Sequence, residues 1–104
     1  MNQSISLKLS HSELSALAFI TWNVSACLLQ NKNDLYRLAG LHLHKLHHRL
    51  NQKAGIVYGK TKAVRLNLPE VLSLHQFIHF TSEFDDVYTS TVRNQVFTTI
   101  DKML

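Results

Sequence analysis

The chain has 104 residues, of which 45% are hydrophobic and 17% are charged, and its formal net charge is +4. This is the length and composition of one folded domain, so the sequence excludes a second domain and a disordered or fibrous protein. The single cysteine, Cys27, excludes an intramolecular disulfide and indicates a reducing compartment, so we expect a cytoplasmic protein with Cys27 buried on an apolar helix.

The first half of the chain predicts one strand and two helices. Residues 4–10 alternate apolar and polar side chains, as in a strand with one buried face. Ser10 and Glu13 have the spacing of a capping box, and a helix is expected from there to about Gln30. Its apolar residues surround nearly the whole circumference, so this helix should be the central core helix. Polar residues interrupt it before it reaches the length of a membrane span, and no membrane contact is expected.

The second helix is expected over residues 34–53, after the polar residues 31–34. Its buried stripe is predicted to contain Leu35, Leu38, Ala39, Leu43, Leu46 and Leu50. Gly55 is expected to end this helix. The segment 55–61 resembles a phosphate-binding loop, but only three residues separate its glycines and it follows a helix, so we interpret it as a connecting turn.

The second half of the chain repeats this order of elements. Residues 63–68 alternate again and predict a strand whose apolar residues, the last of them Leu68, face the core. Pro69 suits the first turn of a short helix over residues 69–80. Ser82 is expected to cap a fourth helix that runs to the end of the sequence.

The two strand–helix–helix halves, about 4–53 and 62–104, indicate an internal duplication within a single domain, 1–104. Neither strand can stand alone, because an isolated strand leaves its backbone amides unpaired. We therefore expect the two strands to pair with each other in antiparallel orientation. The sequence predicts an α+β, mostly helical fold, in which a two-stranded antiparallel ribbon and four helices come from a duplicated unit.

Positive charge is concentrated in residues 32–65, which we call the basic segment. It contains eight Lys and Arg residues and one Asp, whereas the rest of the chain contains three Lys and Arg residues and six Asp and Glu residues. Such a segment attracts polyanions, because each phosphate contact releases condensed counterions. The same composition occurs on solvated helix faces, and the sequence leaves both interpretations open.

No residue pattern predicts an enzyme or a cofactor. Cys27 and the serines lack the strained turn, glycine-rich elbow or flanking acid of an activated nucleophile. The residues of two histidine pairs, His44 with His48 and His75 with His79, are four positions apart, which places two imidazoles on one helix face, as zinc or nickel sites require. The sequence lacks a His-Glu-x-x-His pattern, so we expect no metal cofactor and retain these four histidines only as candidate ligands.

Residues 62–104, which begin Lys62-Ala-Val-Arg-Leu-Asn-Leu-Pro-Glu, resemble the ribbon–helix–helix family of DNA-binding proteins, and residues 4–50 are similar to a looser version of it. The resemblance implies that both strands form one ribbon in the major groove of DNA, as a single-chain pseudo-dimer. It also implies that the outward strand side chains contact the bases. These side chains are Ser6, Lys8, Arg65 and Asn67, and Arg, Lys and Asn carry groups that suit base edges.

The same resemblance implies that helix N-termini near Asn33 and Ser82 contact phosphates through free backbone amides. Lys62, Arg37 and Lys45 of the basic segment are expected to add positive charge to this nucleic-acid-binding surface. The sequence departs from the family in three respects. Three of its four helices are longer than is usual, the glycine turn between helices is missing, and Asp85 and Asp86 would face phosphate.

We therefore expect a non-enzymatic DNA-binding protein, either a small regulator or an accessory factor. The alternative is an oligomerising protein–protein interaction module without a nucleic-acid role, which would use the apolar first helix and an exposed patch. The expected partner is accordingly DNA or a second copy of the chain.

Overall fold

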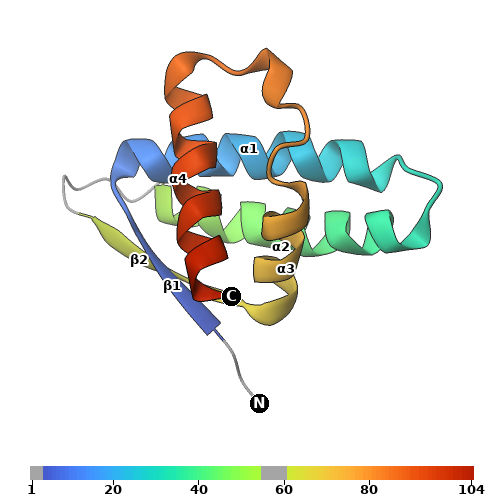
Figure 1. Cartoon of the computed structure of the whole chain (residues 1–104), viewed down its shortest axis with the longest axis horizontal. Helices are drawn as coiled ribbons and strands as arrows, with labels where there is room; N and C mark the ends of the chain where they lie inside the picture. Colours follow the sequence, from blue (N-terminus) through green and yellow to red (C-terminus); the bar gives the residue numbers. More distant parts are fainter. Residues whose placement is uncertain (1–3, 55–60) are drawn as a thin grey trace.

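The computed structural model describes residues 4–54 and 61–104, apart from the side chain of Phe84. The described elements, in chain order, are β1 (Ser4–Leu9), α1 (His11–Leu29), α2 (Asp34–Ala54), β2 (Lys62–Asn67), α3 (Leu68–Phe77), the 3-10 helix η1 (Ser82–Phe84) and α4 (Val87–Met103). As predicted, the described part is α+β and mostly helical, with a two-stranded antiparallel sheet and four α-helices (Figure 1). The predicted helix end at Gly55 and residues 55–60 of the predicted turn lie outside the described residues.

The two strands form the ribbon that the alternating patterns predict. β1 and β2 pair antiparallel, with Leu7 opposite Val64 and Ser6 opposite Arg65. One face of the ribbon is buried against the helices through Leu7, Leu9, Val64 and Leu66. Because side chains alternate along a strand, the polar residues between them point to the opposite face.

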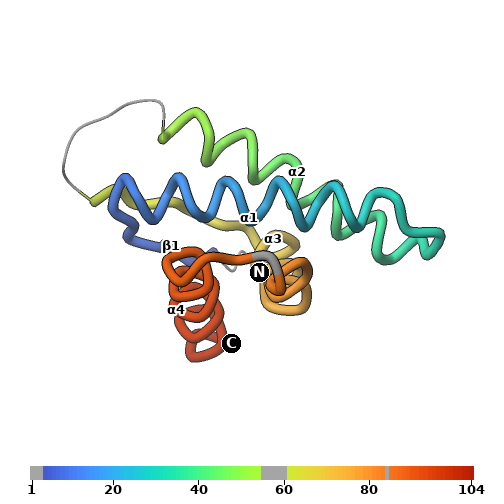
Figure 2. The backbone as a smooth tube through the Cα atoms, turned by 90° about the horizontal axis from the view of Figure 1, so that it is seen from above, coloured from blue at the N-terminus to red at the C-terminus, as the bar shows by residue number. Residues whose placement is uncertain are grey.

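The first two helices form a long antiparallel hairpin, and α3 and α4 lie together on one side of it (Figure 2). The predicted capping box at the start of α1 is confirmed: the Glu13 amide donates to Ser10 Oγ (3.2 Å), and the Ser10 amide donates to Glu13 Oε1 (2.8 Å). A side chain at Gly40 on α2 would place its Cβ 3.0 Å from the Cβ of Leu28 on α1. Glycine at this position therefore permits the close approach of the two helices.

Several residues that the sequence predicts to be buried are exposed. Phe19 and Trp22 on α1 are 55% and 51% exposed, so α1 has one open face, and Cys27 is exposed as well. On α2, Leu35 and Leu38 are 73% and 51% exposed, because they border a groove between α2 and α3 that no described element fills. Among the described helices, only α1 is long and apolar enough to cross a membrane, and half of that apolar stretch is buried inside the protein.

The boundaries of the later elements differ from those predicted. Leu68 is not a strand residue: it begins α3, because the Asn67 side chain caps the helix from the last residue of β2. Ser82 does not cap the last helix but begins η1, and Asp86 is the N-cap of α4. Asp86 Oδ1 accepts from the Thr89 amide at 2.7 Å, and this hydrogen bond holds the pKa of the Asp86 carboxyl below its ordinary value of 3.8.

A buried arginine fixes the connection between α3 and α4. Arg93 of α4 is 1% exposed, and its guanidinium pairs with the Asp85 carboxylate through Nε (2.5 Å) and Nη2 (2.9 Å). Arg93 Nη1 also donates to the carbonyl oxygens of Ile78 and Phe80. Arg93 Nη2 donates to the hydroxyl of Thr81, whose φ of 65° is unusual for a β-branched residue. One side chain thus satisfies the polar groups of a turn that would otherwise be buried without partners.

We predict that Arg93→Met lowers the free energy of unfolding by about 3–5 kcal/mol, because the substitution leaves the Asp85 carboxylate buried without its cation. Urea denaturation followed by circular dichroism measures this loss. Arg37→Met is the matched control, since Arg37 pairs with Asp34 at an exposed position and should contribute less than about 1 kcal/mol. Equal losses in the two variants would contradict this role of Arg93.

Candidate nucleic-acid interface

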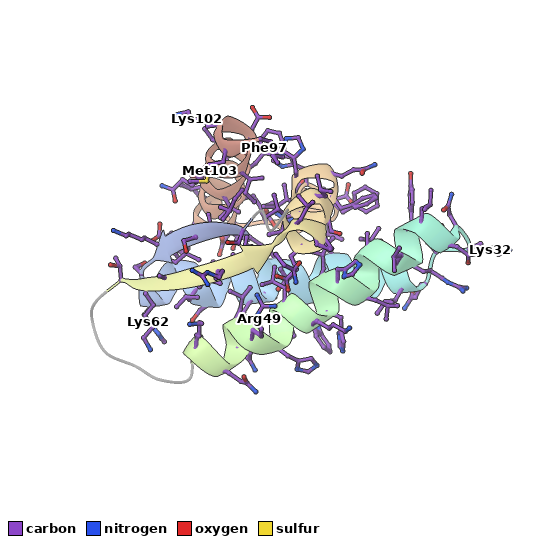
Figure 3. The ribbon with its side chains drawn as sticks, turned by 90° about the horizontal axis from the view of Figure 1, so that it is seen from below. Lys32, Arg49, Lys62, Phe97, Lys102 and Met103 are labelled. Carbon is purple, nitrogen blue, oxygen red and sulfur yellow. The ribbon has the colours of Figure 1, made fainter. Side chains whose placement is uncertain are left out.

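The face of the ribbon opposite the core is open to solvent. We call it the outer ribbon face, and all six of its residues are exposed: Ser4, Ser6, Lys8, Ala63, Arg65 and Asn67. Viewed from below, the ribbon lies in front of α1, between α2 on one side and α3 with α4 on the other (Figure 3). The helices therefore support the ribbon from behind and leave this face accessible to a ligand.

Two cations on the outer ribbon face are free to bind a ligand. Arg65 lies opposite Ser6, and Lys8 lies opposite Ala63, in neighbouring cross-strand pairs. Within the described residues, neither the Lys8 ammonium nor the Arg65 guanidinium has a hydrogen-bond or ion-pair partner. Their donors are consequently available, together with the hydroxyl of Ser6.

The fourth predicted base-contacting residue, Asn67, already has a structural role. Its Oδ1 accepts from the Glu70 amide at 3.0 Å and caps α3. An asparagine that recognises adenine uses both its carbonyl oxygen and its amide nitrogen. With its oxygen engaged in the cap, Asn67 has only the amide nitrogen to offer at the end of the ribbon.

The C-terminal half of α2 brings part of the basic segment beside β2. Arg49 Nη2 donates to the Arg65 carbonyl oxygen at 2.8 Å, and Lys53 Nζ donates to the Ala63 carbonyl oxygen at 3.3 Å. These contacts also occupy backbone acceptors of a two-stranded sheet, which would otherwise be open to pairing with another chain. Lys45 lies one helical turn before Arg49 on the same side of α2 and is exposed.

Arg49 also neutralises Glu70, an acid at the end of the ribbon. Both of its terminal nitrogens donate to the carboxylate of Glu70, which is 2% exposed. The same carboxylate accepts from the Asn67 amide at 3.0 Å and completes the capping box of α3. A buried carboxylate with these three donors adds no free negative charge to the adjoining ribbon face.

Lys62 and Arg37, two predicted members of the surface, lie elsewhere. Lys62 pairs with Leu9 on the inward register of the ribbon, and its Nζ donates to the Lys53 carbonyl oxygen at 3.3 Å, near the end of α2. Arg37 pairs with Asp34 at 3.2 Å in the first turn of α2. The nearby Lys32 marks this end of the molecule, far from the ribbon (Figure 3).

The N-termini of α2 and α4 do not flank the ribbon as the family resemblance implies. α2 begins at the end of the molecule remote from the strands, and α4 begins at the opposite side and runs toward them with its C-terminal end (Figure 1). Phosphate contacts at the ribbon would therefore depend on side chains rather than on the amides near Asn33 or Ser82.

A groove of mixed polar and apolar lining beside β1 was not predicted. It lies between β1 and α4, has a volume of about 610 Å³, and is bordered on β1 by Ser6 and Lys8 and on α1 by the acid Glu13. Besides Val96, the α4 residues that line it carry uncharged hydrogen-bonding side chains: Thr91, Asn94, Gln95, Thr98 and Thr99. Hydroxyl and amide groups of this kind commonly contact phosphates and base edges. The signal in the sequence was the absence of charge on this helix face.

The candidate metal ligands remain as two separate pairs. His75 Nε2 lies 2.9 Å from Asp101 Oδ1, and its ring stacks on Phe97, so this imidazole is already engaged. His44 and His48, in contrast, direct their Nε2 atoms at each other at 3.2 Å. The described residues contain no group of three or more potential ligands that could hold a metal ion.

Comparison with protein-family models, with curated proteins and with solved structures finds no match for this chain. Its function is therefore inferred from the surface geometry alone.

We predict that Arg49→Gln lowers the free energy of unfolding by about 1–3 kcal/mol, because Glu70 stays buried while its charged donors are lost. Chemical denaturation checks the value. Lys53→Gln, which removes a single contact at 3.3 Å from the same helix, should change stability by less than about 0.5 kcal/mol. A smaller effect at Arg49 than at Lys53 would show that the ion pair with Glu70 does not stabilise the junction.

Proposed function

We propose that the protein binds double-stranded DNA through its outer ribbon face and acts as a non-enzymatic regulator or accessory factor. The observation that carries the proposal is an exposed antiparallel ribbon with two cations, Lys8 and Arg65, whose charged groups have no partner among residues 4–54 and 61–104. A two-stranded ribbon has the dimensions to enter the major groove of B-form DNA, where the base edges carry sequence information. The core-facing side of the ribbon supplies the rigidity that such contacts need.

The residues of the ribbon and those beside it suit contacts with different parts of the DNA. Arg65 and Lys8 suit the acceptors of guanine, and the Ser6 hydroxyl suits either a donor or an acceptor. Lys53 lies beside β2 and Lys45 lies two helical turns before it on α2, where cations would neutralise backbone phosphates. The threonine and amide side chains of α4 border β1 and offer uncharged contacts on the other side.

We also propose that the two halves of the chain arose by duplication of one strand–helix–helix unit. The chain would then be a single-chain pseudo-dimer in which each half supplies one strand of the ribbon. Support comes from the repeated order of elements and from the antiparallel pairing of the two strands. The halves have diverged, since α1 contains 19 residues and α3 contains 10. One chain supplies both strands, so a single copy is sufficient to form the surface.

We predict that the double variant Lys8→Ala/Arg65→Ala binds DNA at least about tenfold more weakly than the parent, because it removes both free cations of the outer ribbon face. Fluorescence anisotropy with a labelled mixed-sequence duplex at about 50 mM salt measures the affinity. For the parent protein, the logarithm of the association constant should fall linearly with the logarithm of salt concentration.

The matched control is Lys32→Ala/Arg37→Ala, which removes the same formal charge where α2 begins, at the end of the molecule marked by Lys32 (Figure 3). It should retain most of the affinity. Equal losses in the two double variants would mean that binding depends on net charge and not on the ribbon. A parent protein that binds no duplex at this salt concentration would overturn the DNA-binding proposal itself.

A second candidate function, self-association, is favoured by the apolar groove between α2 and α3. The groove has a volume of about 470 Å³, and exposed leucines border it: Leu35, Leu38, Leu68 and Leu72. Contiguous exposed apolar surface of this kind is typical of interaction sites. Asp34 and Arg37 beside it provide one acid and one base, so the patch can complement the same patch on a second copy of the chain.

For this second function, we predict that the parent chain is a dimer in solution and that Leu68→Ser/Leu72→Ser converts it to a monomer, because the variant removes apolar area from the groove. Light scattering coupled to gel filtration measures the mass. Val87→Ser/Tyr88→Ser changes exposed apolar residues outside the groove and should leave the dimer intact. A monomeric parent at all concentrations would exclude self-association.

A further inference from the structure

The pair formed by His44 and His48 has the geometry of a chelating site. The two side chains lie one helical turn apart on α2, and their Nε2 atoms are 3.2 Å from each other. A metal ion at the usual zinc–nitrogen distance of about 2.0–2.1 Å from both atoms would subtend an N–metal–N angle of about 100–106°. This angle is close to tetrahedral, so both nitrogens can bind one ion without rearrangement of the helix.

The accessibility of the pair also suits a metal ion. His48 is exposed and His44 is partly exposed, so hydrated ions can reach both Nε2 atoms. The direct contact between two imidazole nitrogens requires that one presents N–H and the other a lone pair. A bound cation would use the Nε2 lone pairs of both rings, and each neutral imidazole would then carry its proton on Nδ1.

The neighbouring residues hold the site in position. His47 Nδ1 lies 2.8 Å from the Ala18 carbonyl oxygen and connects this part of α2 to α1. The indole of Trp22 packs against the rings of His47 and His44, with ring centroids 5.2 Å and 6.5 Å apart. The histidine pair is therefore placed on a helix whose orientation is fixed by packing against α1.

The other histidine pair provides a contrast within the same molecule. His75 and His79 have the same spacing, but the His75 nitrogen contacts Asp101 and both rings lie against Phe97. No contact between the two imidazole nitrogens joins this pair in the described structure. Equal spacing in the sequence therefore leads to a preformed pair at one position and to separately engaged side chains at the other.

We propose that His44 and His48 form a two-ligand site for a divalent transition-metal ion of the borderline class, such as Zn²⁺ or Ni²⁺. The protein supplies two imidazole nitrogens, and water or a further ligand fills the remaining coordination positions. Imidazole is a preferred ligand for these ions, which bind it more strongly than they bind the oxygen ligands of Mg²⁺ or Ca²⁺ sites. The site is independent of the outer ribbon face.

The experiment uses Trp22, the single tryptophan, as a reporter next to the site. Ni²⁺ is paramagnetic and quenches indole fluorescence at short range, so titration with Ni²⁺ should quench Trp22 emission in a saturable manner. Zn²⁺, which is diamagnetic, should compete and restore the emission. The titration is carried out in a Cys27→Ser background, because the exposed thiol is another ligand for these ions.

The variants His44→Gln and His48→Gln should each raise the half-saturating Ni²⁺ concentration by about tenfold or more. The matched control, His75→Gln/His79→Gln, removes the same number of imidazoles and should titrate as the parent does. Circular dichroism verifies that each variant is folded, and calorimetry with Zn²⁺ gives an independent measure of stoichiometry. Absence of saturable quenching in the parent, or unchanged titration in both single variants, would overturn the proposal.

Discussion

The structure depends on the pairing of two short strands that are distant in the sequence. Each strand has six residues, and neither could satisfy its backbone hydrogen-bonding groups in isolation. Their antiparallel register places the apolar residues of both strands on one face, where they join a core built around α1. A shift of one residue in this register would turn the buried face toward solvent, so burial and pairing fix each other. The polar outer ribbon face is the necessary counterpart of that buried face.

The elements that were predicted correctly are those encoded by local patterns. Alternation gave both strands, and the capping box of Ser10 and Glu13 gave the start of α1, because these signals depend on residues at most three positions apart. The exposure of Leu35 and Trp22 was missed, since the spacing of apolar residues along a helix does not reveal whether another element covers them. Similarly, α2 and α4 both approach the ribbon with their C-terminal ends, and this orientation follows from the packing of the helices and not from their composition.

Two arginines show why the candidate surface was only partly predictable. In the sequence, Arg49 belongs to the basic segment like any other cation, but in the fold it pairs with the buried carboxylate of Glu70. Arg93 of α4 lies outside that segment and is buried in an ion pair with Asp85, which belongs to the turn before α4. The first pair joins α2 to α3, and the second joins α4 to the turn before it. A count of charges in the sequence treats all four residues as surface groups. By contrast, Lys8 and Arg65 lie where their alternation along the strands placed them.

The separation of β1 and β2 along the chain has a consequence for the order of folding. Along the chain, the hairpin of α1 and α2 lies entirely between β1 and β2. It is stabilised by contacts between these two helices, which are adjacent in sequence. During synthesis it can become compact early, while β1 has no partner until the ribosome has released residue Asn67. Until then the apolar face of β1 is unprotected, and this short segment is open to a chaperone or to aggregation.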